Sequence, residues 1–229
     1  NVTTSMAEND LDHDMTTSLT STSTMSTSPM EDAKETQGPV TCELLILYGS
    51  QTGTAYEVAD QIARDARRRY VKPRVMSMDQ YDIRNLISER VVVFVAATAG
   101  QGEEPDNMKK FWKFLLRKSL PSTSLTEMTF AVFGLGDSSY PKFNFAAKKL
   151  NKRLLQLGGK MIAGLGLADD QHALGVDGAL NTWLEIFWAN LLSRHPLPHG
   201  KVIIPSSEIS PPKFNVRVLP SPSQQQKQQ

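Results

Sequence analysis

The sequence predicts a doubly wound α/β fold in which a five-stranded parallel sheet carries helices on both faces. Apolar runs of strand length alternate along the chain with stretches whose apolar residues recur at helical spacing. The run over 91–97 is apolar without a break, which is typical of a parallel strand that is covered on both faces. Strands and helices that alternate in this way favour the doubly wound class.

The two ends of the chain differ in composition from its middle. Residues 1–40 are rich in Ser, Thr and Met and contain seven acidic residues against one lysine, so we expect a disordered acidic tail. Residues 197–229 are rich in Pro, Ser and Gln and predict a linker or low-complexity tail, with one short strand pattern at 216–219. The middle, residues 41–196, has the length of one compact domain.

Composition also excludes several classes of protein. No apolar run approaches the roughly 18 residues of a membrane-spanning helix, so no membrane partner is expected. The single cysteine, Cys42, cannot form an internal disulfide and fits a reducing compartment, so we expect a cytoplasmic protein. The net charge of +1 does not favour nucleic acid as a partner. No group of Cys and His residues has the spacing of metal ligands.

The first half of the predicted domain contains three strands and two helices. An apolar run predicts a strand over 43–48, and a stripe of Val, Ile and Ala side chains predicts a helix over 55–70. A short strand follows at 73–77, and 81–87 predicts a weak turn or helix. The long apolar run indicates a strand over 90–97, after which a helix over 106–118 begins with Asp106 as its N-cap.

The second half contains two strands and two helices. A strand over 128–134 precedes a helix over 143–157, which ends at Gly158 and Gly159, a typical helix stop signal. The last strand is expected over 160–165. A helix over 178–193, rich in Leu and Trp, completes the domain.

The loop after the first strand has the composition of a phosphate site. The helix behind it presents free N–H groups and the positive end of its dipole. Glycine lets the backbone approach a ligand closely, and hydroxyl groups add donors. The candidate phosphate-binding residues are Ser50, Gln51, Thr52, Gly53, Thr54 and Ala55. The loop lacks the lysine of a nucleotide-binding P-loop, and a helix cap without a ligand is the alternative interpretation.

Four loops are expected to meet at one edge of the sheet. The loops near residues 50, 100, 138 and 169 all follow strands, and ligands of doubly wound sheets bind outside the carboxyl ends of strands. Tyr140 is an aromatic residue in the third loop that could stack on a flat ring. A phosphate at one end and a planar ring at the other describe flavin mononucleotide (FMN). No GxGxxG pattern follows a strand, so dinucleotide binding is not supported.

These loops resemble those of the diflavin reductases, whose FMN domain has a flavodoxin-like fold. The resemblance rests on Ser50 to Ala55, on the TAGQG sequence over 98–102, and on the FGLGDSSYPKFN sequence over 133–144. It covers residues 43–196. Together with the DDQH sequence over 169–172, these motifs are most similar to the NADPH-dependent diflavin oxidoreductases of cytosolic iron–sulfur protein assembly.

The resemblance implies that the first loop holds the FMN phosphate and that later loops surround the ribityl chain and the isoalloxazine. The further cofactor-binding residues that it implies are Ala97, Thr98, Ala99, Gly100, Leu135, Gly136, Asp137, Ser138, Ser139, Tyr140, Pro141, Lys142, Phe143, Asn144 and Asp170. Ala99 stands where cytochrome P450 reductases have an aromatic residue, which puts a second stacking ring in question. No residue is expected to be catalytic, because the flavin carries the chemistry.

The activity implied by the resemblance is electron relay. FMN would take electrons from FAD in an NADPH-oxidising reductase module and pass them to an iron–sulfur protein of the anamorsin type. The 229 residues contain no counterpart of the FAD- and NADPH-binding module, so this chain is not expected to oxidise NADPH by itself. Two alternatives are an interaction module that binds the acceptor without delivering electrons, and a free-standing flavodoxin-like carrier.

Acidic residues gather on the same loops. They are Glu103, Glu104, Asp106, Asp137, Asp169 and Asp170. A rim of carboxylates would disfavour an anionic reduced flavin, and it would attract basic partners. The sequence therefore predicts an acidic rim that lowers the reduction potential of the flavin.

Overall fold

A six-stranded parallel sheet forms the centre of the domain in the computed structural model, which describes residues 40–208. The strands are β1 (Glu43–Gly49), β2 (Lys72–Ser77), β3 (Val91–Ala97), β4 (Thr129–Gly136), β5 (Lys160–Met161) and β6 (Gly166–Asp169). Their order is β2-β1-β3-β4, and both β5 and β6 pair with β4. Every pairing is parallel, which confirms the predicted class of fold, with six strands in place of five.

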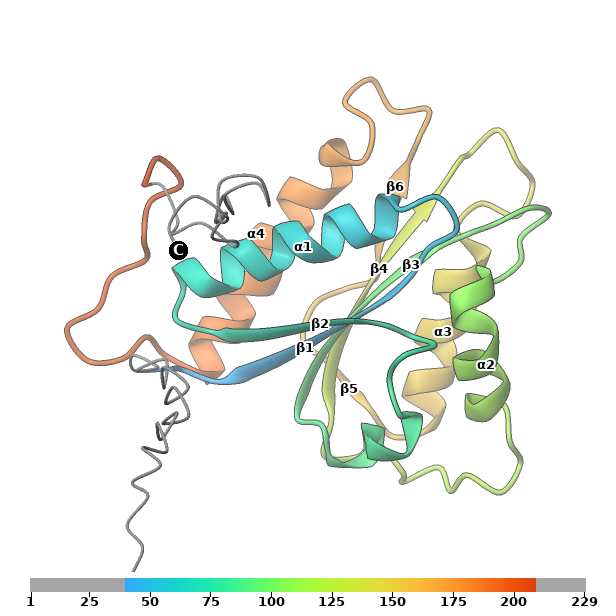
Figure 1. Cartoon of the computed structure of the whole chain (residues 1–229), viewed down its shortest axis with the longest axis horizontal. Coiled ribbons are helices and arrows are strands. Elements are labelled where there is room, and N and C mark those ends of the chain that lie inside the picture. The colour runs from blue at the N-terminus through green and yellow to red at the C-terminus, as the bar shows by residue number, and fades with distance from the viewer. Residues whose placement is uncertain (1–39, 209–229) are drawn as a thin grey trace, which may run out of the picture. The chain divides into compact units, whose positions relative to one another are not determined.

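Helices cover both faces of this sheet. They are α1 (Thr54–Arg68), the 3-10 helix η1 (Ile83–Ser88), α2 (Asp106–Leu115), α3 (Phe145–Gln156) and α4 (Asp177–Arg194). Figure 1 shows α1 and α4 on one face and α2 and α3 on the other. Each face buries its own apolar cluster, and alternate residues of β3 belong to one cluster or the other. The unbroken apolar run of β3 is therefore explained, because both of its faces are covered.

The register of the strands brings the loops of interest to one edge. Gly49 at the end of β1 lies opposite Ala96 of β3, and Ala97 lies opposite Leu135 of β4. On the other side of β4, Gly136 lies opposite Asp169 at the end of β6. Because these strands are parallel, the loops that leave β1, β3, β4 and β6 emerge side by side, as the sequence predicts.

The last strand of the sheet is not where the sequence predicts it. In place of one strand over 160–165, the chain forms the two-residue β5, leaves the sheet, and returns as β6. Two side chains of α4 stabilise this break: Asn190 Nδ2 donates to the carbonyl of Ile162 at 2.8 Å, and Trp183 Nε1 donates to the carbonyl of Gly164 at 2.7 Å. The interrupted strand therefore satisfies its carbonyl groups through side chains rather than through a neighbouring strand.

Three helix boundaries also differ from the prediction. Asp106 is the first residue of α2, and Pro105 takes the N-cap position, so the predicted cap is wrong. Helix α2 ends at Leu115 rather than near residue 118. Helix α3 begins at Phe145 because Asn144 has a left-handed conformation, with φ 54° and ψ 31°, which a right-handed helix cannot include. The predicted stop at Gly158 is confirmed by its φ of 90°.

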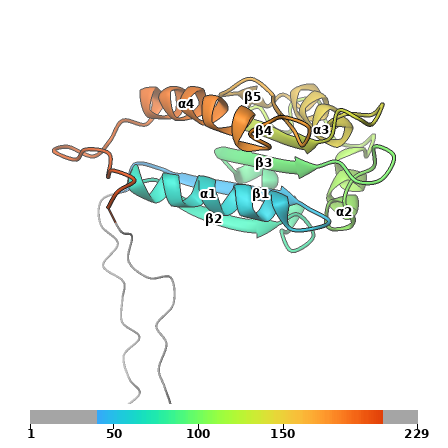
Figure 2. The same cartoon turned by 90° about the horizontal axis from the view of Figure 1, so that it is seen from above.

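The first part of the predicted linker lies against the domain. The backbone N–H of Ile204 donates to the carbonyl of Arg68 at 3.0 Å, and Arg68 Nη2 donates to the carbonyl of Ser206 at 3.3 Å. Figure 2 shows this segment passing near the C-terminal end of α1. Residues 204–206 therefore contact the domain at the end of α1 that is remote from the β1–α1 loop. Residues 1–39 of the predicted acidic tail, which was expected over 1–40, and the strand pattern at 216–219 lie outside the described residues.

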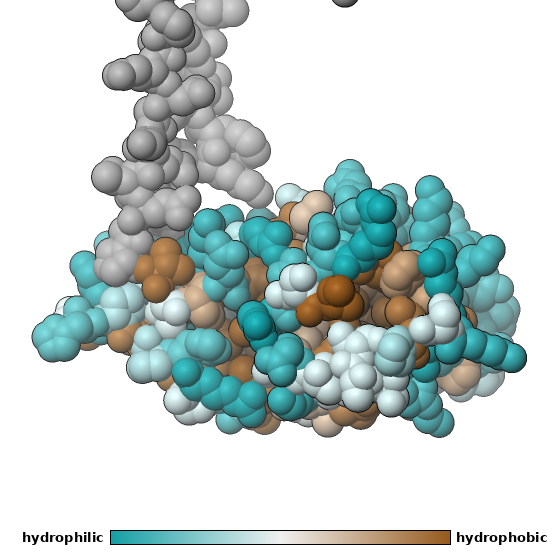
Figure 3. Space-filling model, turned by 90° about the horizontal axis from the view of Figure 1, so that it is seen from below, coloured by the Kyte–Doolittle hydropathy of each residue, from teal (hydrophilic) through white to brown (hydrophobic). Residues whose placement is uncertain are grey.

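Figure 3 shows the face of the molecule that is seen from below. In the view from below, brown residues occupy small separate areas among teal and white ones (Figure 3). Within residues 40–208, no helix has the length and apolar character needed to cross a membrane.

Candidate functional site

The β1–α1 loop is shaped by its own serine and glycine. Ser50 Oγ accepts hydrogen bonds from the N–H groups of Gly53 at 2.9 Å and Ala55 at 3.3 Å. Gly53 caps α1 with φ 110°, a conformation that favours glycine strongly. Ser50 therefore folds the loop back over the start of α1, so that its first role is to hold the loop in shape.

The beginning of α2 braces this loop from the side. The N–H of Ser50 donates to Asn107 Oδ1 at 2.9 Å. The amide of Gln51 makes two contacts with Asp106: its Oε1 accepts from the backbone N–H at 3.2 Å, and its Nε2 lies 3.4 Å from the carboxylate. Gln51 is thus engaged with α2 in this structure. Sequence reasoning missed Asn107, because nothing in the local pattern shows that α2 starts beside β1.

The remaining donors of the loop face outward. Within the described part of the chain, the backbone N–H groups of Gln51, Thr52 and Thr54 donate to no protein atom. Thr52 and Thr54 are exposed, and their hydroxyl oxygens lie 3.5 Å apart. Free N–H groups, two neighbouring hydroxyls and the positive end of a 15-residue helix together make a site that favours an anion.

The β3–α2 loop is a tight turn closed by backbone hydrogen bonds. The N–H of Ala99 donates to the carbonyl of Glu103 at 2.9 Å, and the N–H of Glu103 donates back at 2.8 Å. Gly100 and Gly102 both have positive φ, of 49° and 96°. A Cβ on Gly102 would collide with the side chain of Lys142, so this glycine lets the second and third loops touch.

The β4–α3 loop is held by two carboxylates. Asp137 Oδ1 accepts from the N–H of Ser139 at 2.8 Å. Asp169, at the end of β6, accepts from the N–H of Ser138 at 2.9 Å and from the N–H of Gln171 at 3.1 Å. Asp169 therefore ties the third loop to the fourth, although it was expected to act only through its charge.

Asn144 is the buried anchor of the same loop. Its side chain is fully buried, and its Nδ2 donates to the carbonyl of Ala168 in β6 at 2.8 Å. Its Oδ1 is buried without a partner among the described residues. A Cβ on Gly134 would lie 2.6 Å from that oxygen, and a Cβ on Gly136 would lie 2.8 Å from the backbone nitrogen of Asn144. The two glycines therefore make the room that Asn144 occupies.

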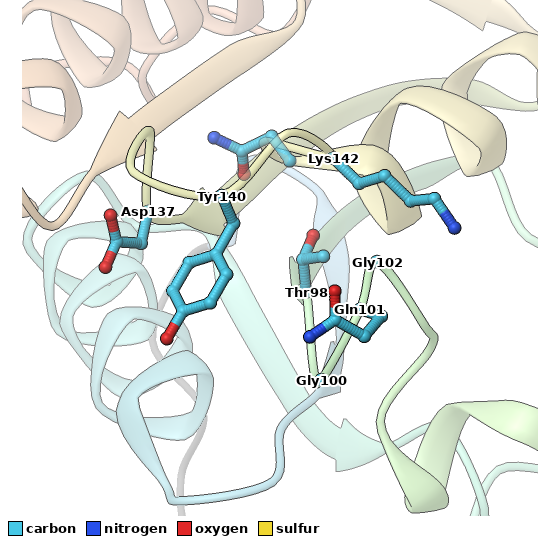
Figure 4. Close-up of a pocket in the computed structure, with 8 residues that line it drawn as sticks. Thr98, Gly100, Gln101, Gly102, Asp137, Tyr140 and Lys142 are labelled. Carbon is cyan, nitrogen blue, oxygen red and sulfur yellow. The ribbon is translucent and has the colours of Figure 1, made fainter.

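A cleft of about 280 Å³ opens between the second and third loops. Its lining residues are Thr98, Gly100, Gln101, Gly102, Asp137, Tyr140, Lys142 and Asn144. Figure 4 shows the ring of Tyr140 projecting from the third loop toward the mouth of the cleft, across from the loop that carries Thr98 and Gly100. Tyr140 is 53% exposed, so one face of its ring is free to contact a ligand.

The cleft unites only part of the predicted site. Of the residues predicted in the second and third loops, Thr98, Gly100, Asp137, Tyr140, Lys142 and Asn144 line it, whereas Gln101 and Gly102 were not predicted. The other predicted residues of these loops, Ala97, Ala99, Leu135, Gly136, Ser138, Ser139, Pro141 and Phe143, lie on the same loops or at the strand ends but not in its lining. The glycine-rich pattern around Gln101 could have predicted that Gln101 and Gly102 belong to the site.

Asp170 and the β1–α1 loop border this region. Asp170 donates its backbone N–H to the carbonyl of Gly136 at 2.9 Å, so its place beside the third loop is fixed by the backbone. The β1–α1 loop is outside the cleft lining, at the neighbouring strand end. The geometry suits a ligand with an anionic end on α1 and a flat end beside Tyr140. FMN has this form, so the residues present fit it.

The acidic rim is partly neutralised within the protein. Glu104 forms an ion pair with Lys149, and Asp106 forms one with Lys109 at 2.6 Å. Asp137 and Asp169 accept backbone N–H groups and form no ion pair among residues 40–208. Within residues 40–208, the rim carboxylates that form no ion pair are therefore Glu103 of the second loop and those of the third and fourth loops.

The carboxylates of the third and fourth loops give a pH prediction. Hydrogen bonds from Ser138 lower the pKa of Asp169, and hydrogen bonds from Ser139 lower that of Asp137. A lowered pKa in the folded state means that the stabilisation is present above the ordinary value of about 3.9 and is lost as the pH falls through the lowered pKa. We expect the amide NMR signals of Ser138 and Ser139 to move only below about pH 4.

A substitution of Asp169 distinguishes its effect from that of Asp137. In D169N, the amide NMR signal of Ser138 should no longer move as the pH falls, whereas the amide signal of Ser139 should still move. A midpoint above pH 5 for either amide would contradict the assigned hydrogen bonds.

The parallel sheet with its ligand loops at one edge defines a flavodoxin-like domain. A family model described as flavodoxin matches residues 46–183, and the chain belongs to that family. Solved structures agree. A flavodoxin 1 from Bacillus cereus is 27% identical with a TM-score of 0.53, covering 63% of this chain and 96% of that one. A mutant flavodoxin from Pseudomonas aeruginosa is 26% identical with a TM-score of 0.56, covering 65% of this chain and 98% of that one.

Within that family, the chain is similar to proteins named NADPH-dependent diflavin oxidoreductase 1. The protein from Danio rerio is 57% identical over 171 residues, which is 75% of this chain and 29% of the relative. The proteins from Bos taurus and Arabidopsis thaliana are 53% and 46% identical, over 77% and 76% of this chain and 30% and 29% of the relatives. The chain thus spans about three tenths of the length of these relatives.

Proposed function

We propose that this chain binds FMN and serves as the electron-relay domain of an NADPH-dependent diflavin oxidoreductase. The proposal rests on two features that lie together at one edge of the sheet. The β1–α1 loop and the start of α1 present hydrogen-bond donors that suit an anion. Beside them, a cleft with an aromatic residue in its wall opens between the next two loops. Neither half alone would require a flavin. Together they match the two chemically different ends of FMN.

The residues divide into those that bind and those that position. Thr52, Thr54 and the N–H groups around them would hold the phosphate as neutral donors, without a lysine. Tyr140 would lie against the isoalloxazine. Ser50 and Asn144 would keep the first and third loops in place. A bound flavin supplies the redox chemistry, because it can couple a two-electron donor to a one-electron acceptor.

The names of the relatives support a role in a longer chain of electron transfer. Their name implies NADPH as the source and a second flavin in the same protein. We therefore propose that electrons arrive from FAD in a reductase module. By the loop motifs, the acceptor is an iron–sulfur protein of the anamorsin type in cytosolic iron–sulfur assembly, and the protein acts in the cytoplasm.

The decisive experiment is to purify the chain and identify what it carries. A yellow protein that releases FMN, and not FAD, on denaturation would support the proposal, as would reduction by a separately supplied FAD- and NADPH-binding module. A colourless protein that takes up no added FMN would contradict it and would favour a module that only binds the acceptor. Reduction in trans by an unrelated reductase alone would favour a free-standing carrier.

Thr52→Ala tests the phosphate end of the site. We expect FMN affinity to fall about fivefold, because the loss of one hydroxyl hydrogen bond costs about 1 kcal/mol while the other donors remain. Thr52→Ser keeps the hydroxyl and should bind FMN nearly as well as the wild type. The measurement is titration of the apoprotein with FMN by flavin fluorescence. Equal affinity of Thr52→Ala and wild type would remove Thr52 from the site.

A further inference from the structure

A second and larger cleft lies away from the proposed flavin site, between α2 and the segment that follows β2. Its volume is about 500 Å³, within the range of roughly 300–1,000 Å³ that is usual for binding sites. We call it the basic groove. Its lining residues are Met78, Asp79, Tyr81, Asp82, Ile83, Lys110, Phe111, Lys113, Phe114 and Arg117.

The floor of the basic groove is apolar and recessed. Met78, Tyr81 and Phe111 line it, yet they are only 2%, 7% and 1% exposed. The hydroxyl of Tyr81 is already engaged, since it donates to Glu89 Oε1 at 3.0 Å. A flat surface laid over the groove would not reach these side chains. A single protruding apolar side chain would reach them.

One wall of the groove is a row of three cations. Lys110, Lys113 and Arg117 follow one another at helical spacing along one side of α2 and its C-terminal end. None of the three forms an ion pair within residues 40–208. The guanidinium of Arg117 lies 4.4 Å from the centre of the Phe114 ring, so the aromatic wall and the cationic wall are continuous.

The acids of the opposite wall are engaged within their own segment. Asp82 forms an ion pair with Arg84 at 2.6 Å, and its side chain accepts from the backbone N–H of Arg84 at 3.1 Å. Asp79 accepts a hydrogen bond from the hydroxyl of Ser77. Within residues 40–208, the groove therefore presents three unpaired cations on one side; on the other side Asp82 is paired with Arg84, and Asp79 keeps its negative charge.

We propose that the basic groove binds an acidic segment of a partner protein that inserts one large apolar side chain between α2 and the β2–η1 segment. The acidic residues would pair with Lys110, Lys113 and Arg117, and the apolar side chain would contact Phe111 and Met78. The cations, unpaired within residues 40–208, favour an acidic partner through charge complementarity. The recessed floor favours a partner with one protruding apolar side chain, because a flat membrane surface would not reach it. The proposal is independent of flavin binding.

The test uses the whole chain, labelled with ¹⁵N, and a short synthetic peptide that has one phenylalanine among aspartates and glutamates. We expect saturable amide shifts confined to residues 78–83 and 110–117, the same with and without added FMN. A peptide with serine in place of phenylalanine should bind at least tenfold more weakly, since it lacks the anchor.

Charge-reversed variants make the result specific. The double variant K110E/K113E should bind the peptide at least tenfold more weakly, and K152E/K160E, which reverses two exposed lysines on α3 and β5, should bind as the wild type does. Equal losses in both variants would show a general charge effect and overturn the proposal. It would also be overturned by shifts centred on residues 98–102 and 137–144. Binding to phosphatidylserine vesicles that depends on Lys110 and Lys113, with no binding of the peptide, would overturn it in favour of a membrane.

Discussion

Asn144→Ala is expected to lower the free energy of unfolding by about 1.5–3.5 kcal/mol. Alanine removes the buried hydrogen bond that Asn144 Nδ2 donates to the carbonyl of Ala168, at a cost of about 0.5–1.5 kcal/mol. Alanine must also adopt the left-handed conformation found at this position, which costs about 1–2 kcal/mol. Urea unfolding followed by tryptophan fluorescence measures the total.

Asn144→Gly separates the two contributions. Glycine adopts positive φ without strain but cannot donate to Ala168, so it should lose only the hydrogen-bond part. We expect the stability of Asn144→Gly to lie between that of the wild type and that of Asn144→Ala. Both variants should also bind FMN more weakly, because the third loop is no longer tied to β6. Wild-type stability in both would show that Asn144 does not anchor the loop.

The parts of the fold that could be predicted from the sequence are those in which local pattern and packing agree. The apolar run of β3 predicts a strand with two covered faces, and both apolar clusters do include its residues. The convergence of the loops follows from parallel strands alone, and the register of Gly49 with Ala96 confirms it. For β3 and for these loops, the local sequence pattern is sufficient to predict their position in the fold.

The parts that could not be predicted depend on partners distant in sequence. The break between β5 and β6 is stabilised by Trp183 and Asn190, which lie on a helix 19 and 28 residues further along from the carbonyls that they satisfy. The brace on the first loop depends on Gln51 meeting Asp106 across 55 residues. Neither contact leaves a periodic signal, because a single side-chain hydrogen bond does not change the local pattern.

The same reason limits the prediction of charge. The acidic residues of the loops could be counted in the sequence, but the pairing of Glu104 with Lys149, which is 45 residues further along, could not be assigned. Lys149 of α3 reaches Glu104, and Lys109 reaches Asp106, so two members of the predicted rim are compensated. An effect of the rim on the flavin potential should therefore come from Asp137 and Asp169 more than from Glu104.

Tyr140→Ala is expected to weaken FMN binding by about 1–3 kcal/mol, or roughly 5–150-fold, which is the cost of removing an aromatic ring that stacks on a base. The ring stands on a loop whose position is fixed: the N–H of Tyr140 donates to the carbonyl of Asp137 at 3.2 Å, and Asn144 anchors the end of the same loop. The loss should therefore come from the missing ring rather than from a collapsed loop. Titration of the apoprotein by flavin fluorescence measures the affinity.

Two further variants decide what Tyr140 contributes. Tyr140→Phe keeps the ring and should bind FMN within about twofold of the wild type, because stacking needs no hydroxyl. Leu174→Ala removes another side chain, 69% exposed, from the loop after β6 and should have no effect. If Tyr140→Phe loses as much affinity as Tyr140→Ala, the hydroxyl and not the ring face contacts the ligand. If Tyr140→Ala binds FMN as the wild type does, the isoalloxazine does not lie on Tyr140, and the cleft holds another part of the ligand.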